Sequence, residues 1–128
     1  MVARVVRLGS ARAADEGLRI GTVRRPPRGV LKSAFASQNW YDLWYPDLAP
    51  SAPLVRMALN AASPAQWQAF AKKYRAEMAQ PANRRSLDLL AALSHHANFS
   101  VGCYCEDEAR CHRSILRALL IERGARVG

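Results

Sequence analysis

The chain has 128 residues, 50% of them hydrophobic and 23% charged, a composition that supports one compact domain and argues against global disorder. No apolar run reaches the ~18 residues of a membrane helix, and Arg4 and Arg7 interrupt the apolar start, which argues against a secretory leader. The net charge is +9, and residues 1–32 alone carry +6. We therefore expect a cytoplasmic protein whose basic surface attracts phosphate- or carboxylate-bearing partners; the alternative is that arginine only keeps the surface soluble.

The first half of the chain predicts three strands, at residues 2–8, 18–24 and 40–44. The second strand stops before Pro26 and Pro27, because proline cannot donate to a strand ladder. An irregular, basic loop is expected from Arg25 to Asn39. The third strand is rich in aromatic residues and is closed by Pro46.

Helices dominate the second half, and three of them are predicted at about residues 52–60, 64–80 and 82–95. Ser63 and Gln66 form a capping box for the second of these helices, and Pro64 occupies its first position. Apolar residues then recur at helical spacing, which indicates a core-facing stripe: Trp67, Phe70, Ala71, Tyr74 and Met78. The third helix should turn Leu87, Leu90 and Leu93 inward.

A buried strand at 99–105 and a last helix near 110–123, stopped by Gly124, complete the predicted elements. A strand that leads directly into a helix is typical of α/β folds. The predicted fold class is α/β: a single domain over residues 1–128, with its core at about 2–123. It has a mixed, mostly parallel sheet with helices packed on it.

The three cysteines of the chain, Cys103, Cys105 and Cys111, lie within nine positions. Secreted disulfide scaffolds distribute an even number of cysteines along the chain, so this cluster predicts a chemical or packing role instead. Ligands of α/β sheets bind beyond the carboxyl ends of the strands. There, the positive end of the last helix, with Arg110 and Arg113, would favour a thiolate at Cys111 and bind an oxyanion.

Three interpretations of this segment stay open. In the first, Cys111 is a reactive thiol beside an anion site, and a Cys105–Cys111 disulfide acting as a redox switch is a variant of it. In the second, Cys103, Cys105 and Cys111 hold zinc. His112 is left out of this ligand set, because the adjacent Cys111 and His112 are poorly suited to share one ion. In the third, the cysteines are buried and inert.

The pattern of Cys103, seven further residues, then Cys111-His112-Arg113-Ser114 resembles the family named domain of unknown function 488. Three further segments are similar to the YeaO-like branch of that family: Trp44 to Ser51, Phe70 to Glu77, and Arg24 with Pro27-Arg28-Gly29. The resemblance extends from about Val5 to Arg123.

The resemblance implies a single α/β domain with a Rossmann-like sheet, and it implies no particular reaction. Carried over by position, the candidate site consists of Arg24, Arg28, Cys103, Cys111, His112 and Arg113. Two positions depart from the pattern. Thr22-Val23 stand where other members commonly place an aspartate before the residue matching Arg24, and Cys105 stands where many carry glutamate.

Together these observations predict a thiol and arginine pocket for a phosphate- or carboxylate-bearing ligand, with a nucleotide or nucleic-acid fragment as the natural choice. Cys111 would react and His112 would move a proton, while Arg24, Arg28 and Arg113 would hold the anion beside Cys103, with Asp42 or Asp47 orienting Arg24 or Arg28. No cofactor is required. The alternative function is a non-catalytic nucleic-acid-binding or regulatory module whose cysteines are structural or bind zinc.

Overall fold

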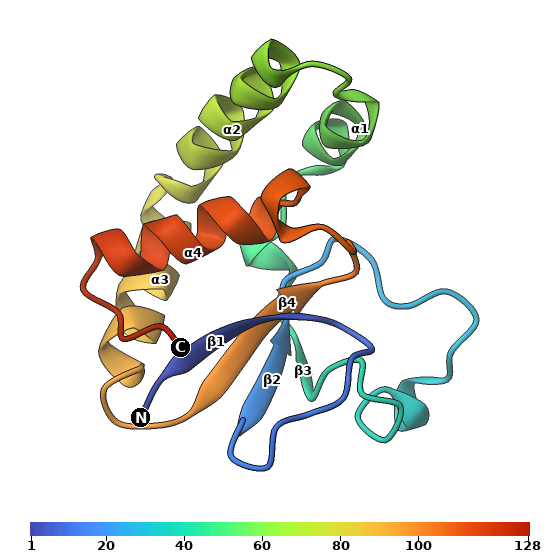
Figure 1. The fold of residues 1–128 in the computed structure, drawn as a ribbon, viewed down its shortest axis with the longest axis vertical. Coiled ribbons are helices and arrows are strands. Elements are labelled where there is room, and N and C mark those ends of the chain that lie inside the picture. The colour runs from blue at the N-terminus through green and yellow to red at the C-terminus, as the bar shows by residue number, and fades with distance from the viewer.

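Four parallel strands form the centre of the structure, a computed structural model that describes residues 1–128 (Figure 1). The strands are β1 (Ala3–Arg7), β2 (Leu18–Gly21), β3 (Leu43–Trp44) and β4 (Phe99–Cys103). Their order in the sheet is β1-β4-β2-β3, and every pairing is parallel. The predicted α/β class is therefore confirmed, and the sheet is wholly parallel.

All four strands are shorter than the sequence predicts, and the largest reductions, of three residues each, are in β2 and β3. The Tyr41 ring lies where a Cβ on Gly21 would be, so the backbone at Trp40 and Tyr41 does not join the ladder. The third strand is reduced to two residues, which pair with Ile20 and Gly21.

The helices are α1 (Ala52–Asn60), α2 (Pro64–Met78), α3 (Pro81–Leu93) and α4 (His112–Glu122). The backbone N–H of Gln66 donates to the Ser63 hydroxyl at 3.2 Å, so the predicted N-cap of α2 is confirmed. In a capping box the Gln66 side chain would accept from the backbone N–H of Ser63. Here it accepts from the backbone N–H of Ala62, one residue earlier. Gly124, at φ 84°, ends α4 as expected.

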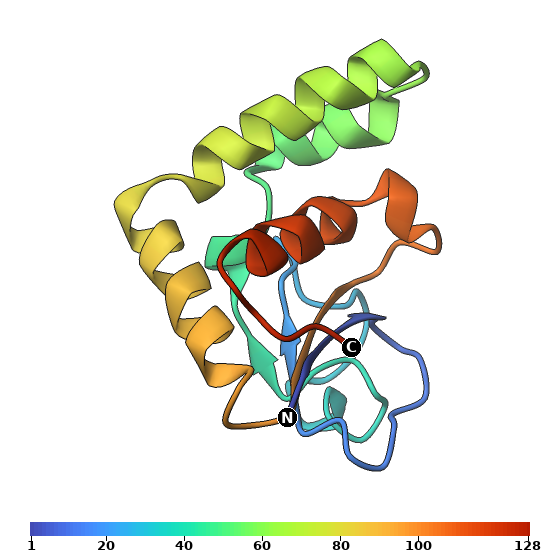
Figure 2. The ribbon, with the colours of Figure 1, turned by 60° about the vertical axis from the view of Figure 1, so that its left-hand side comes forward.

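Each helix contributes buried side chains to the same core as the sheet, for instance Leu54, Phe70, Leu87 and Leu116, which join Val101. In the ribbon, α1 and α2 form an antiparallel pair, and α4 lies between this pair and the sheet (Figures 1 and 2). The predicted stripe of α2 is confirmed: Phe70, Tyr74 and Met78 are buried, and Trp67 and Ala71 are half-buried against the same core.

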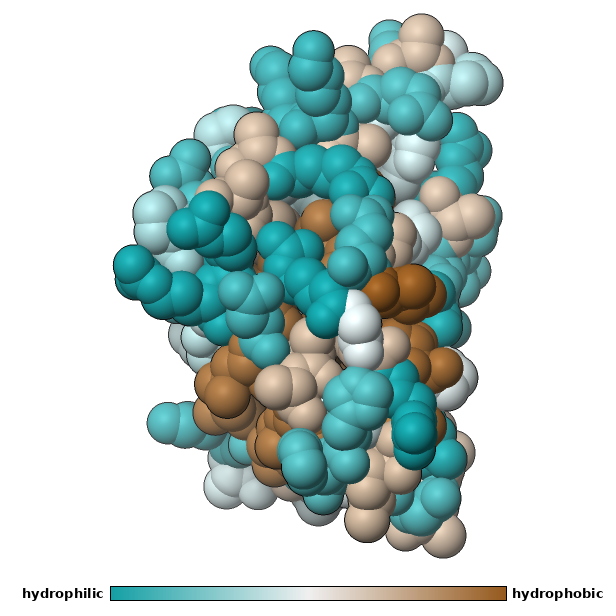
Figure 3. Space-filling model, turned by 90° about the vertical axis from the view of Figure 1, so that its left-hand side faces the viewer, coloured by the Kyte–Doolittle hydropathy of each residue, from teal (hydrophilic) through white to brown (hydrophobic).

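The inward face of α3 differs from the prediction. Leu87 is buried, but Leu93 is 38% exposed, and Ala91 takes the buried position near the helix end. Leu89 is also exposed, and on this side of the molecule hydrophobic residues form small patches separated by hydrophilic ones (Figure 3). Leu90, the remaining predicted member of this face, is half-buried against the core.

The opposite face of the sheet is covered by loops rather than helices. Gly102 lies against Leu8, and Gly21 against Tyr41. All four strands end at the same edge because they are parallel, so the residues that follow Arg7, Gly21 and Cys103 gather there. No helix is long and apolar enough to cross a membrane.

Candidate functional site

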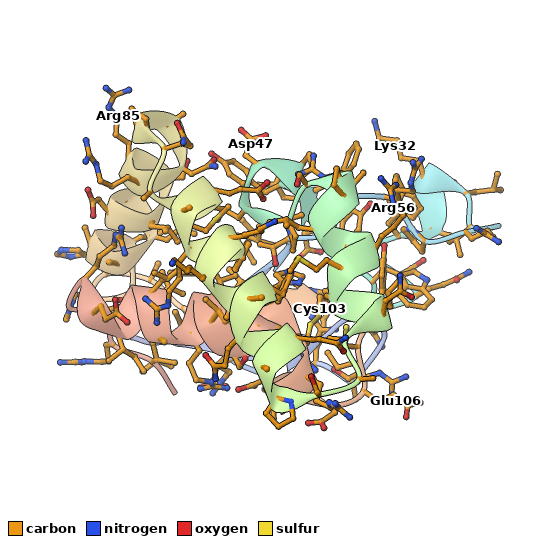
Figure 4. All side chains as sticks on the ribbon, turned by 90° about the horizontal axis from the view of Figure 1, so that it is seen from above. Lys32, Asp47, Arg56, Arg85, Cys103 and Glu106 are labelled. Atoms are coloured by element: carbon orange, nitrogen blue, oxygen red, sulfur yellow. A yellow bond between two sulfur atoms is a disulfide. The ribbon has the colours of Figure 1, made fainter.

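A cavity of about 390 Å³ opens at the carboxyl edge of the sheet, between the strand ends and α1. Cys103, Cys111 and His112 line it together with side chains of α1, and most of its wall is hydrophobic. Seen from above, Cys103 lies beside α1, the helix that carries Arg56 (Figure 4). We call this space the cysteine cavity; its size suits a small organic ligand.

Cys111 is the N-cap of α4, so the predicted position at the start of the last helix is confirmed. Its side chain makes no capping hydrogen bond to the helix backbone. The first N–H groups of a helix carry partial positive charge, which stabilises an anion or a thiolate beside them. Cys111 is 2% exposed overall and reaches space only through the cysteine cavity.

Two arginines of α4 hold the loop that leads from β4 to Cys111. Arg113 donates to the carbonyl of Cys105 at 2.6 Å, and Arg117 forms a two-bond ion pair with Glu108, both distances being 2.9 Å. Arg113 is 4% exposed and its Nε has no partner. The loop is thereby fixed, and with it the position of the Cys111 sulfur.

His112 has a defined tautomer. Its Nε2 lies 2.8 Å from the carbonyl oxygen of Thr22, which can only accept, so Nε2 carries the hydrogen. In the neutral ring Nδ1 is then an unprotonated acceptor, and it lies 3.7 Å from the Cys111 sulfur. The Tyr74 ring packs edge-on against the imidazole, with ring centroids 5.6 Å apart, and holds its plane.

The charge state of His112 follows from its surroundings. Burial lowers its pKa to about 4, and the positive charge of Arg113 acts in the same direction, while the hydrogen bond to Thr22 opposes them. The imidazole is therefore neutral at pH 7, with the Nδ1 lone pair facing the sulfur. This arrangement suits a proton acceptor or a metal ligand.

The sulfur atoms of Cys103 and Cys111 are in direct contact at the floor of the cavity and are joined as a pair. Their Cα atoms are 7.9 Å apart, whereas disulfides usually span about 4.4–6.8 Å. Cys105 is unpaired and exposed, so the predicted Cys105–Cys111 pairing is wrong. Cys105 follows the end of β4 at Cys103 and lines the cysteine cavity without joining the sulfur pair.

Arginine side chains surround the cavity, and no aspartate or glutamate is among its lining residues. Arg24 is fixed by bonds from its guanidinium to the carbonyls of Pro50 and Ala49, at 3.0 and 3.1 Å. The exposed Arg25, Arg56 and Arg110 also line it. A negatively charged ligand would therefore meet guanidinium groups without competition from carboxylates.

The residues of the predicted anion site do not all meet. Arg24 lines the cysteine cavity, but Arg28 lines a neighbouring one, because Pro26 and Pro27 redirect the chain between them. Arg113 lines neither and instead holds the β4–α4 loop. Asp42, expected to orient Arg24 or Arg28, accepts two bonds from Arg12 instead, at 2.8 and 3.0 Å.

The metal-ligand set also differs from the predicted one. The ligand atoms of Cys103, Cys111 and His112 all lie within 4.8 Å of one another. Cys105 is not part of this group, and the expectation that neighbours Cys111 and His112 cannot face one ion is wrong. Cys111 is still extended, at φ −134° and ψ 152°, while His112 is already helical, so the two side chains converge.

Sequence reasoning did not identify several residues of the site. The carbonyl of Thr22 fixes His112, and its position directly after a strand at the ligand edge was the available signal. Arg56 reaches the cavity from α1, and nothing in its local sequence indicates this. Tyr104 lines the cavity from the first position after β4.

Comparison with known proteins places this chain in a family. Residues 3–124 match the family model described as the active DUF488-N3 subclade, DUF488-N3a. No curated protein and no solved structure is significantly similar to the chain. The match covers almost the whole domain, including the strand ends, the cysteine pair and α4, and the chain therefore belongs to the DUF488 family, in its active N3 subclade.

Proposed function

We propose that the protein is a cysteine-dependent enzyme that holds a phosphate- or carboxylate-bearing ligand of about nucleotide size in the cysteine cavity. The observation that carries this proposal is the pair formed by the Cys111 sulfur and His112 Nδ1, 3.7 Å apart on the floor of that cavity. Arg24, Arg25, Arg56 and Arg110 supply the positive charge around it. The description of the subclade as active agrees with an enzyme.

In the proposed reaction, a thiol reductant first reduces the Cys103–Cys111 pair to two thiols and is itself oxidised to a disulfide. His112 Nδ1 then takes the proton of the Cys111 thiol, and the sulfur forms a bond to an electrophilic carbon or phosphorus of the ligand. The bond from that atom to the leaving group breaks, and the leaving group takes its proton from His112. Charging a buried imidazole at the positive end of α4 is unfavourable, but the thiolate formed beside it offsets that cost, and the same helix end stabilises the thiolate. The bond to Thr22 keeps Nδ1 directed at the sulfur throughout.

Within the family, we propose that the chain is related to the YeaO-like branch, because its segments Trp44 to Ser51 and Phe70 to Glu77 are similar to that branch. These segments contribute Pro50 and Phe70 to the cavity wall. We also propose a cytoplasmic location, because reducing conditions there keep thiols free.

Cysteine alkylation as a function of pH tests the thiol role. The reduced protein is treated with iodoacetamide, and modification of each cysteine is followed by mass spectrometry. We expect a pKa for Cys111 below the ordinary value of about 8.5. Cys105 serves as the internal reference, because the groups packed around its sulfur partly desolvate it and raise its pKa.

Two comparisons make this experiment decisive. His112→Gln should raise the pKa of Cys111, and thymidine 5′-monophosphate should slow alkylation of Cys111. A midpoint for Cys111 at or above that of Cys105 would refute the thiol function. Unchanged alkylation of Cys111 in the presence of thymidine 5′-monophosphate would refute binding in the cysteine cavity.

A second candidate, a zinc site, is favoured by one observation: three ligand atoms converge within 4.8 Å beside an open cavity. Zinc binds cysteine sulfur and histidine nitrogen at about 2.3 and 2.0–2.1 Å, and catalytic sites use three protein ligands and leave a fourth position for water or substrate. The Nε2–H bond to a backbone carbonyl is typical of metal-binding histidines.

Metal analysis separates the two candidates. A zinc enzyme would contain about one zinc per chain, would lose it in Cys103→Ser, and would keep it in the matched variant Cys105→Ser. Substitution by cobalt would give sulfur-to-metal charge-transfer absorption in the wild type. Protein purified without zinc that also takes up no cobalt would exclude this candidate and leave the thiol function.

A further inference from the structure

We propose that the ligand of this protein is single-stranded nucleic acid, one nucleotide of which occupies the cysteine cavity while its neighbour occupies a second cavity beside it. This inference rests on the function proposed above and extends it to a substrate class. The second cavity has a volume of about 610 Å³ and is lined by Arg7, Arg28 and Trp40, among others. We call it the tryptophan cavity.

The two cavities share a wall. Arg25 and Tyr104 line both of them. The Tyr104 hydroxyl donates to the carbonyl of Arg25 at 2.9 Å, which holds the ring between the two spaces. Arg7 donates to the carbonyl of Tyr104 at 3.4 Å from the other side. The two cavities are therefore adjacent, with Arg25 and Tyr104 between them.

Positive charge continues through both cavities. Six arginines line them, and neither lining includes an aspartate or a glutamate: Arg7, Arg24, Arg25, Arg28, Arg56 and Arg110. Only Arg7 has a carboxylate partner, Glu106 at 3.5 Å, in a pair that is largely exposed. A single phosphate cannot use charges distributed over two cavities, whereas a chain with one phosphate per nucleotide can.

Two aromatic side chains fit nucleobases: Tyr104 of the shared wall and Trp40, which lines the tryptophan cavity alone. The Trp40 and Tyr104 rings meet edge to face, with centroids 5.9 Å apart. The Trp40 ring lies against Gly9, at φ 91°, where a Cβ would be only 3.0 Å from a ring carbon. Both rings are thus fixed beside guanidinium groups.

Aromatic rings beside arginines are the combination that binds unpaired strands, because bases stack on the rings and phosphates meet the charges. A duplex keeps its bases stacked inside and cannot place one base in each of two small cavities. An acidic peptide would use the charges but not the rings. The observations therefore favour an unpaired strand over both.

Competition binding tests the inference. A fluorescein-labelled thymidine octanucleotide is bound to the full chain at low salt and is displaced by thymidine 5′-monophosphate or by unlabelled oligothymidylates of two and four nucleotides. We expect the tetranucleotide to bind at least about tenfold more tightly than the mononucleotide, since it adds stacked bases and phosphate contacts. Affinity should also fall steeply with added salt.

Three variants assign the effect to the two cavities. Arg28→Ala, in the tryptophan cavity alone, should reduce the ratio of tetranucleotide to mononucleotide affinity towards one. Arg56→Ala, in the cysteine cavity alone, should weaken both competitors. Arg75→Ala is the matched control, because Arg75 pairs with Glu122, at 3.0 Å, and lines neither cavity.

Each outcome has a defined meaning. Equal affinity for mononucleotide and tetranucleotide would refute the extended strand and leave the proposed function intact. Equally strong competition by tetraglutamate would show a general anion site and refute the nucleic-acid assignment. If no nucleotide competes and alkylation of Cys111 is also unaffected by thymidine 5′-monophosphate, both proposals fail together.

Discussion

Arginines serve opposite purposes at the two ends of the sheet. Near the start of β2, Arg19 is fully buried and donates to Glu16 at 2.7 and 2.9 Å, and to the carbonyls of Ser10 and Asn39. At the carboxyl edge, Arg25, Arg56 and Arg110 are exposed beside a cavity that no carboxylate lines. The same side chain is structural where a carboxylate accompanies it and available to a ligand where none does.

The difference also explains where the charge of +9 is located. Acidic residues neutralise arginines elsewhere, as in Arg12–Asp42 and Arg117–Glu108. Five arginines that form no ion pair line the two cavities: Arg24, Arg25, Arg28, Arg56 and Arg110. Arg84, Arg85 and Arg126 also form no ion pair but line neither cavity. The five cavity arginines attract an anionic ligand to the edge that carries the cysteine pair.

Removing the buried carboxylate should have a severe effect on stability. Glu16→Gln leaves the Arg19 guanidinium buried without a counter-charge, which we expect to lower the free energy of unfolding by about 3–5 kcal/mol. Urea denaturation at pH 7 measures this loss. Asp15→Asn is the matched control, because the Arg4–Asp15 pair is exposed on its acidic side. Similar losses in both variants would contradict a special role for the buried pair.

The same pair predicts how stability depends on pH. Burial by itself would raise the pKa of Glu16, but hydrogen bonds from Arg19 and Ser100 and the charge of Arg19 outweigh it and lower the pKa from 4.5 to about 2. The carboxylate therefore contributes fully above about pH 4.5, and this contribution, about 3 kcal/mol, is lost as the pH falls through about 2. We expect the stability difference between wild type and Glu16→Gln to shrink below pH 4.5; a constant difference down to pH 2 would exclude this linkage.

Asp42 should have an intermediate effect. It accepts two bonds from Arg12 and one from the backbone N–H of Arg19 at 2.8 Å, and it is partly exposed. Asp42→Ala should therefore lower the free energy of unfolding by about 1–2 kcal/mol. Thermal denaturation compares it with Asp47→Ala, for which no ion pair exists and little change is expected. An equal loss in Asp47→Ala would show that Asp42 has no bracing role.

The arginines of the carboxyl edge should contribute almost nothing to stability. Arg25→Ala and Arg110→Ala remove exposed side chains, so we expect changes within about 0.5 kcal/mol. Both should nevertheless weaken the displacement of labelled oligonucleotide by thymidine 5′-monophosphate. Calorimetry and competition binding on the same samples measure the two effects. A large loss of stability would place these arginines with Arg19 and remove the contrast between the two ends.

The sequence alone determined the elements whose signals are local. The bounds of α1 and the N-cap of α2 follow from residues that are neighbours in the chain, and the glycine that ends α4 acts within one turn. The buried stripe around Phe70 and Tyr74 follows from helical period. The motif from Cys103 to Ser114 likewise marked the family and the ligand edge before any coordinates were considered.

Only the tertiary structure decided which of these residues meet. The change from extended to helical backbone between Cys111 and His112 turns their side chains to one point, against the expectation drawn from adjacency. Two prolines separate Arg28 from Arg24, and Arg56 arrives from a helix that no local pattern links to the cysteines. Side chains converge through the packing of distant segments, and short-range sequence patterns carry no information about that packing.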